Sequence, residues 1–154
     1  MEKYHLKIKT YMDRHKIKAE HFVFTDSCHS VKQAARMINA PIDQFVKNIC
    51  MVDGAGKLIV AIVKGEDRAS TSRVSKALQI DKPRLGNDSE ILEHTGFPAG
   101  GVPSFGFPAL YLIDPKVAES EYIFTGGGSL NSLIRIDIQE MITLNNGIVV
   151  RVRK

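Results

Sequence analysis

Apolar and polar residues alternate in short stretches along this chain, and turn-forming residues separate the stretches. Residues 2–16 show the spacing of an amphipathic helix, whereas residues 45–53 and 57–63 have the patterns of strands. The Asp-Gly-Ala-Gly segment at 53–56 is typical of a turn, so these two strands are predicted to form an antiparallel hairpin. Residues 58–63 are apolar at every position, which predicts that both faces of the second strand are covered.

Cap residues predict where the shorter helices begin. We expect helices to begin after Ser30, after Ser70 or Thr71, after Asn87 or Asp88 and after Asp137, and a short helical turn at residues 115–120. Further strands are expected at residues 21–25, 109–113, 121–124, 132–136 and 148–152. Helices and strands interleave, but few spacings suit regular parallel units. The pattern therefore predicts an α/β (α+β) fold with a mixed sheet and outer helices, in a single domain over residues 1–154.

Composition restricts the class of protein. The chain has 154 residues, 44% hydrophobic and 25% charged, which is ordinary for a globular protein. No apolar run approaches the length of a membrane span, and no apolar signal region opens the chain, so we expect a cytoplasmic protein. Cys28 and Cys50 are too few and too far apart to suggest a disulfide framework or a zinc site, so two reduced thiols are expected.

The formal net charge is +4, which suits an RNA-binding surface but also an ordinary solvated one. Basic residues gather in three stretches of the sequence. These are Lys3, Lys7, Lys9, Arg14, Lys16 and Lys18; Lys64, Arg68, Arg73, Lys76, Lys82 and Arg84; and Arg151, Arg153 and Lys154. Both interpretations stay open for each stretch.

Residues 95–108 form the segment richest in glycine and proline, with four glycines and three prolines in TGFPAGGVPSFGFP. Neither a helix nor a central strand tolerates this density, because proline lacks a backbone donor and glycine costs chain entropy. The segment is therefore predicted to be an ordered loop that can present its main chain to a ligand. A purely structural loop that turns a corner of the fold is the alternative.

Lys47 interrupts an apolar row of the first hairpin strand. Alternation places it on one face with Phe45, Ile49 and Met51, where an unpaired charge is costly. The ammonium group either points into a pocket or reaches past the edge of the sheet to water while its stem packs.

Several of these segments resemble the YbaK family, which are editing domains associated with prolyl-tRNA synthetase. Residues 100–106 (GGVPSFG) resemble the family's GGV(S/P)PFG signature, and residues 45–49 (FVKNI) resemble its VKTL strand, which carries the catalytic lysine. Residues 30–35, 112–114 and 125–128 resemble its first core helix, its short strand ending in Asp and its late glycine turn. The resemblance covers residues 20–150 and implies a curved, barrel-like mixed sheet surrounded by helices.

The resemblance also implies an activity and a site, namely deacylation of mischarged aminoacyl-tRNA by a free-standing, trans-acting hydrolase. The implied catalytic residues are Lys47 and Gly101. The implied substrate-binding residues are Gly100, Val102, Pro103, Ser104, Phe105, Gly106, His29, Asp114, Thr125 and Gly126. His29 could also be a surface histidine at a helix start, Asp114 a turn residue before Pro115, and the Thr125 segment a plain turn.

Such a site suits the hydrolysis of an ester, because an ammonium group and backbone N–H groups can stabilise the charge that develops on the carbonyl oxygen. No metal or cofactor is expected, because no ligand spacing and no nucleotide-binding glycine motif occur in the sequence. The resemblance implies a small amino acid (Ala, Cys or Ser) on tRNA(Pro) as the substrate, with a synthetase or an elongation factor as a candidate partner.

Two departures from the family signature leave the amino acid open. Ser104 replaces the second proline, and Phe107 stands where many relatives carry a histidine. The alternatives to an editing enzyme are a non-enzymatic tRNA-binding module and a small-molecule esterase that uses the same pocket. The oligomeric state also stays open.

Overall fold

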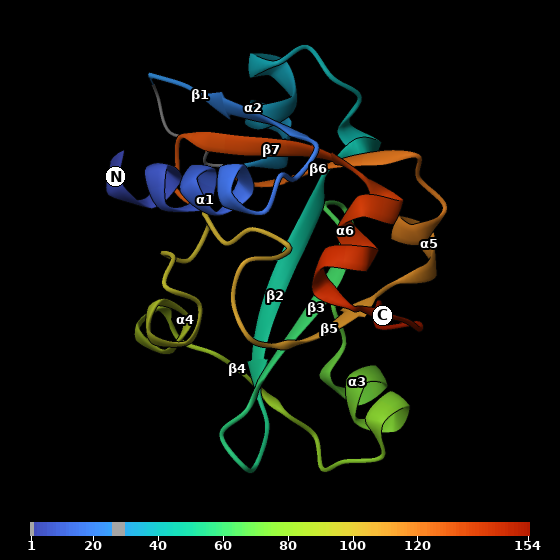
Figure 1. The fold of residues 1–154 in the computed structure, drawn as a ribbon. Coiled ribbons are helices and arrows are strands. Elements are labelled where there is room, and N and C mark those ends of the chain that lie inside the picture. Colours follow the sequence, from blue (N-terminus) through green and yellow to red (C-terminus); the bar gives the residue numbers. More distant parts are fainter. Residues whose placement is uncertain (1, 26–29) are drawn as a thin grey trace.

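The structure is a computed structural model that describes residues 2–25 and 30–154 (Figure 1). Its helices are α1 (Glu2–Arg14), α2 (Val31–Met37), α3 (Thr71–Leu78), α4 (Asp88–Thr95), α5 (Pro115–Ala118) and α6 (Ile138–Asn145), with a 3-10 turn at Ile42–Gln44. Its strands are β1 (Ala19–Val23), β2 (Val46–Val52), β3 (Leu58–Lys64), β4 (Arg84–Leu85), β5 (Leu110–Ile113), β6 (Tyr122–Gly126), β7 (Ser132–Asp137) and β8 (Ile148–Val149).

The strands form two sheets. One has the order β4-β2-β3-β5-β8 and is mixed, because β2 pairs antiparallel with β3 and β4 whereas β3, β5 and β8 run parallel. The other has the order β1-β7-β6 and is antiparallel. A single parallel bridge between Phe45 and Phe124 joins the start of β2 to β6. The expected mixed α/β architecture is confirmed, and the described strands form two sheets that do not close into a true barrel.

Both faces of the central strand β3 are buried, as the apolar run at residues 58–63 predicts. On one face, Val60 and Ile62 of β3 pack in the largest apolar cluster, together with Ile8 of α1. On the other face, Ala61 and Val63 pack in a second cluster with Val74 of α3 and Val152. The helices α1 and α3 therefore cover opposite faces of this sheet.

Most of the predicted caps are present. Ser30 accepts a hydrogen bond from the amide of Gln33, Ser70 accepts one from Arg73, and Asn87 forms a full capping box with Glu90. Asp137 precedes α6 as expected, but its side chain makes no cap hydrogen bond. The last strand ends at Val149 and not at Val152, because the tail leaves β8 to pair with the segment before α3.

The short edge strand β4 has no signal in the sequence. The two-residue strand β4 lies in a stretch without alternation and exists because it pairs with Met51 and Val52 of β2. None of the helices in the described ranges combines the length and the apolarity that a membrane span requires.

Candidate functional site

A cavity of about 350 Å³ lies between α2, the first half of β2, the glycine-rich loop and the end of β6. Its walls are mainly apolar, with Val31 and Ala34 from α2, Phe45 from the start of β2, and Phe124 and Leu133 from the three-stranded sheet. Polar groups come from the side chains of Ser30, Lys47, Asn48, Thr125 and Ser132, and the cavity is also lined by Val46, Ile49, Gly100, Val102 and Gly126. A concave, apolar site with a few polar groups is the usual form of a small-ligand site.

Lys47 carries the only charged side chain among the described residues that line this cavity. It is half-buried in β2 and lies opposite Val63 of β3. Within residues 2–25 and 30–154, no hydrogen bond or ion pair engages its ammonium group. The cation is thus placed at an apolar cavity without an internal partner, so it is available to a ligand.

Asn48, which the sequence analysis did not select, fixes the geometry behind Lys47. Its Nδ2 donates to the carbonyl oxygen of Val102 at 2.9 Å and to Oγ1 of Thr125 at 2.8 Å, and its Oδ1 accepts from Oγ of Ser104 at 2.7 Å. The hydroxyl groups of Ser104 and Thr125 are themselves 2.8 Å apart. This network ties β2, the glycine-rich loop and β6 together, and a polar residue beside Lys47 in an apolar strand was the signal that could have indicated it.

Ser104 is fully buried, and its main chain is held from a second side. Nδ2 of Asn145, at the end of α6, donates to the carbonyl oxygen of Ser104 at 3.0 Å. Ser104 does not line the cavity but positions Asn48 and Thr125, which do. Serine in place of the expected second proline therefore supplies a structural hydroxyl.

The two central glycines of the loop have different roles. Gly100 lines the cavity with φ at +90°, and its amide has no hydrogen-bond partner in the described part of the chain. The amide of Gly101 donates to the carbonyl oxygen of Pro98 at 2.9 Å, and its own carbonyl accepts from the amide of Gly128 at 2.8 Å. The backbone of Gly101 is thus engaged within the protein, whereas Gly100 presents an amide without a partner among the described residues at the cavity.

Close approach explains why glycine occupies position 101. A Cβ there would lie 2.9 Å from backbone atoms of Gly128 and Ser129. A Cβ at Gly126 would lie 2.3 Å from the carbonyl oxygen of Val102. The glycine-rich loop and the glycine turn after β6 therefore pack main chain against main chain.

The rest of the loop lies away from the cavity. Phe105 is fully buried, with its ring centroid 6.1 Å from that of Tyr11 in α1, and Gly106 faces Ile8 of the same helix. Pro103 is buried and is also absent from the cavity lining. These three residues support the loop from behind.

Asp114 lies outside the cavity and is fully buried. Its Oδ1 accepts from the amides of Val152 and Arg153, and its Oδ2 accepts from the Arg153 guanidinium at 2.9 Å and from the amide of Lys116. The carboxylate caps α5 and anchors the C-terminal residues. The structure therefore gives Asp114 a structural role and does not place it at the cavity.

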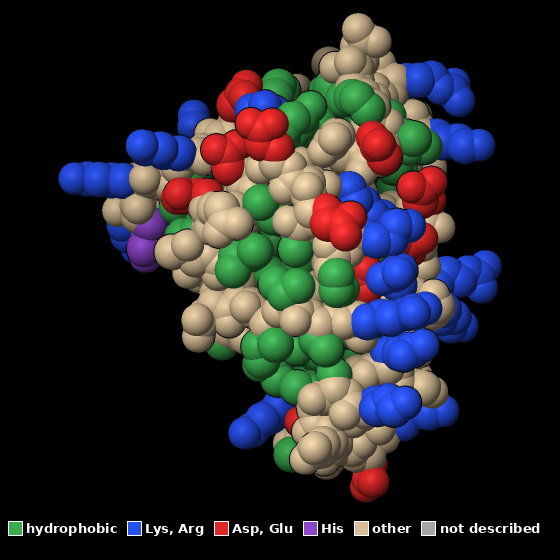
Figure 2. Space-filling view, turned by 90° about the vertical axis from the view of Figure 1, so that its right-hand side faces the viewer, with side chains coloured by type: hydrophobic (Ala, Val, Ile, Leu, Met, Phe, Trp, Pro, Cys, Tyr) green, Lys and Arg blue, Asp and Glu red, His purple; other side chains and the backbone are tan. Residues whose placement is uncertain are grey.

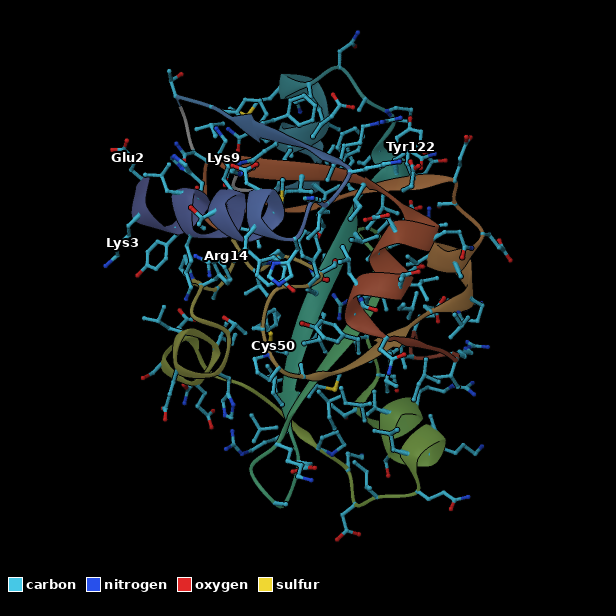
Figure 3. All side chains as sticks on the ribbon, viewed as in Figure 1. Glu2, Lys3, Lys9, Arg14, Cys50 and Tyr122 are labelled. Atoms are coloured by element: carbon cyan, nitrogen blue, oxygen red, sulfur yellow. The ribbon has the colours of Figure 1, made fainter. Side chains whose placement is uncertain are left out.

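Two further candidate groups, His29 and Cys28, lie outside the described residues. Cys50 points from β2 into the interior, where burial raises the pKa of its thiol to about 11, so it is not a nucleophile at neutral pH (Figure 3). In the described ranges, no group of three or more His, Cys, Asp or Glu residues is arranged to hold a metal ion.

The comparisons with known proteins agree on one family. The profile of the aminoacyl-tRNA editing domain matches residues 25–144. An uncharacterized protein, YwhH of Bacillus subtilis (strain 168), is 31% identical over 121 residues, which are 77% of this chain and 76% of that protein. The proline–tRNA ligase of Trichlorobacter lovleyi is 26% identical over 87 residues, which are 56% of this chain but only 15% of the ligase.

A solved structure shows the same fold. The crystal structure of a protein proposed to be a trans-editing enzyme for prolyl-tRNA synthetase superposes with a TM-score of 0.88. The match covers 98% of this chain and 97% of that chain, with 22% sequence identity. At this identity the likeness supports the fold and leaves the substrate to be inferred from the site.

Proposed function

Because the chain belongs to the aminoacyl-tRNA editing domain family, we propose that it hydrolyses the ester of a mischarged aminoacyl-tRNA. The observation that carries this proposal is an apolar cavity lined by both Lys47 and Gly100, whose ammonium group and amide have no partner among the described residues. These are the two kinds of donor that stabilise the oxyanion of an acyl-transfer reaction. We further propose that it acts in the cytoplasm.

The proposed reaction needs no nucleophile from the protein. A water molecule, activated by the neighbouring ribose hydroxyl, attacks the carbonyl carbon of the ester, and negative charge develops on the carbonyl oxygen. Lys47 and the amide of Gly100 stabilise that charge until the bond to the ribose oxygen breaks. The ribose oxygen takes up a proton, and the products are the free amino acid and the uncharged tRNA. The apolar walls limit the access of water to the charged groups and so strengthen their interaction.

We propose a small amino acid as the substrate, because the bulky side chains of Phe45 and Phe124, stacked with ring centroids 4.8 Å apart, form part of the cavity wall. Alanine, cysteine and serine on tRNA(Pro) are the leading candidates, since relatives include proline–tRNA ligases. Action in trans is supported by the likeness to the proposed trans-editing enzyme.

A panel of tRNA(Pro) charged with alanine, cysteine, serine or proline tests this proposal. We expect rapid release of one of the small non-cognate amino acids and retention of proline, measured as loss of the labelled aminoacyl ester over time. Equal release of all four, or release no faster than the uncatalysed reaction, would contradict an editing function.

The esterase alternative has one observation in its favour, since the cavity itself contains no feature that requires RNA. A short aminoacyl ester of the same amino acid distinguishes the two functions. An esterase cleaves it as fast as the charged tRNA, whereas an editing enzyme cleaves it much more slowly because the remote binding energy of the tRNA is missing.

A further inference from the structure

Two basic segments that are far apart in the sequence meet beside α3. The amide of Ser70 donates to the carbonyl oxygen of Val152 at 2.7 Å. The amide of Lys154 donates to the carbonyl oxygen of Arg68 at 2.8 Å. The C-terminal residues therefore run alongside the segment that leads into α3. Both segments lie on the face of the sheet that α3 covers, because Val152 packs in one apolar cluster with Val74 of α3.

Some cations of this region are already neutralised. Arg153 is paired with the buried Asp114 at 2.9 Å, and Lys116 is paired with Asp67 at 3.3 Å. Five others have no carboxylate partner among residues 2–25 and 30–154, and we call them the α3 ridge: Arg68, Arg73, Lys76, Arg151 and Lys154. All of them are exposed except Arg73, which is half-buried. Figure 2 shows Lys and Arg side chains gathered in a column along one edge of the face that includes α3 and the C-terminus.

The α3 ridge lies on the same face of the five-stranded sheet as Lys47. Alternation along β2 puts Lys47 and Met51 on one face, and Met51 packs in one apolar cluster with Val74 of α3 and Val152. These two positions of β2 are four residues apart, about 13 Å along the strand at ~3.3 Å per residue. The basic residues of α1 belong to the other side, because Ile8 packs against the opposite face.

We propose that the α3 ridge binds the phosphates of the double-helical acceptor stem while the aminoacyl end of the same tRNA occupies the cavity. This inference rests on the proposed function. The unpaired 3′ end of a tRNA separates its ester from the stem, so a surface for the stem must lie on the side of Lys47 but at a distance from it. Unpaired Arg and Lys side chains on an open surface suit a phosphate backbone, which is densely charged and releases counterions on binding. The surface positions the tRNA and reads no base sequence.

The test compares two double variants with the same loss of charge. Arg68→Gln with Lys76→Gln removes two exposed cations of the α3 ridge. Lys9→Gln with Arg14→Gln removes two exposed cations of α1 (Figure 3). Binding of labelled, uncharged tRNA is measured by fluorescence anisotropy at several salt concentrations, and circular dichroism confirms that both variants fold.

We expect the ridge variant to bind tRNA about tenfold or more weakly near physiological salt. The slope of log affinity against log salt should fall by about 2, one for each phosphate contact removed. The α1 variant should keep nearly the wild-type affinity and slope. Equal effects of the two variants would overturn the proposal, since the loss would then follow net charge and not the surface.

Two further outcomes would also overturn it. In the first, poly-glutamate displaces the labelled tRNA as efficiently, per charge, as unlabelled RNA does. That result would indicate that the α3 ridge binds an acidic protein and not a tRNA. The other is the absence of measurable tRNA binding by the wild-type protein at low salt. Neither result depends on hydrolysis, so the failure of this proposal is separable from failure of the deacylation panel. If the wild-type protein deacylates the charged tRNA, the ridge variant should have a raised KM and an unchanged kcat, because the α3 ridge does not touch the ester.

Discussion

At the scale of single residues, the site depends on how closely two stretches of main chain approach each other. Gly101 and Gly128 are hydrogen-bonded backbone to backbone, and no space is left for a side chain between them. Lys47 supplies charge, but the glycine-rich loop is held in part by Gly101 and Gly128, which do not line the cavity. Substitutions at such positions should therefore alter the reaction through geometry.

Gly101→Ala should strongly reduce deacylation. The new methyl group would lie 2.9 Å from backbone atoms of Gly128 and Ser129, which cannot rotate away as a side chain would. We expect a loss of about 1–3 kcal/mol in the free energy of unfolding. A shift of the loop by about 1 Å can cost up to ~10²-fold in rate. Thermal melts and deacylation time courses measure both effects.

Gly54→Ala is the matched control, because a Cβ at this turn position between β2 and β3 meets nothing within 4 Å. It should leave the melting temperature and the rate nearly unchanged. A Gly101→Ala protein with the wild-type rate would show that the loop tolerates displacement, contrary to the packing described above.

Asn48→Ala should destabilise the protein and loosen the cavity. The substitution leaves the hydroxyl groups of Ser104 and Thr125 and the carbonyl oxygen of Val102 short of partners in a buried environment. An unsatisfied buried polar group costs about 1–3 kcal/mol, so the midpoint of urea unfolding should fall clearly. An unchanged midpoint would mean that the network adds nothing to stability.

At the scale of elements, β1 and α1 buttress the glycine turn that faces the cavity. Nε2 of His21 in β1 lies 3.0 Å from the carbonyl oxygen of Gly127, and its ring lies 6.0 Å from that of His5 in α1. Burial, with smaller contributions from His5 and Lys9, lowers the pKa of His21 below its ordinary value of 6.5. The neutral imidazole is therefore the form that the folded protein favours.

This shift predicts how stability depends on pH. Below pH 6.5 the unfolded chain binds a proton at position 21 that the folded chain resists, so the free energy of unfolding should decrease as the pH falls from 6.5 toward the lowered pKa. His21→Gln should flatten this decrease, whereas His15→Gln, at an exposed position, should not. Urea titrations between pH 7 and 5 provide the measurement, and identical slopes in all three proteins would refute the assignment.

The sequence predicted those elements and site residues that are specified locally. Hairpin β2–β3 follows from alternation and a turn, and three helix starts follow from Ser30, Ser70 and Asn87. The cavity lining of Lys47, Gly100 and Thr125 was likewise expected from short motifs. These features depend on residues that are neighbours in the chain.

Long-range partners could not be predicted in this way. Asn48 bonds to Ser104 and Thr125, which are 56 and 77 positions away, and Asp114 binds Arg153, 39 positions away. The sequence around an aspartate that precedes a proline does not indicate whether the carboxylate binds a substrate or, as here, the C-terminal residues of the chain. The separation into two sheets was missed for a similar reason, because alternation indicates strands but not which strands pair.

At the scale of the whole molecule, we predict catalysis without a metal ion. In the proposed mechanism the oxyanion is stabilised by the ammonium group of Lys47 on β2, and the described residues that line the cavity include no carboxylate, histidine or cysteine. Deacylation should therefore proceed at the same rate after incubation with an excess of a zinc-selective chelator. Magnesium is kept constant in both samples, because it folds the tRNA. Activity lost with the chelator and restored by zinc would contradict this prediction.

The central claim is that the fold delivers one ammonium group, that of Lys47, to the ester of an aminoacyl-tRNA. The most direct test is the deacylation rate of Lys47→Ala under single-turnover conditions, with Lys57→Ala, at an exposed turn position, as the control. We predict that Lys47→Ala lowers the rate about 10²–10³-fold with little change in the melting curve. Lys57→Ala should keep the wild-type rate. A folded Lys47→Ala protein that deacylates at the wild-type rate would contradict the account.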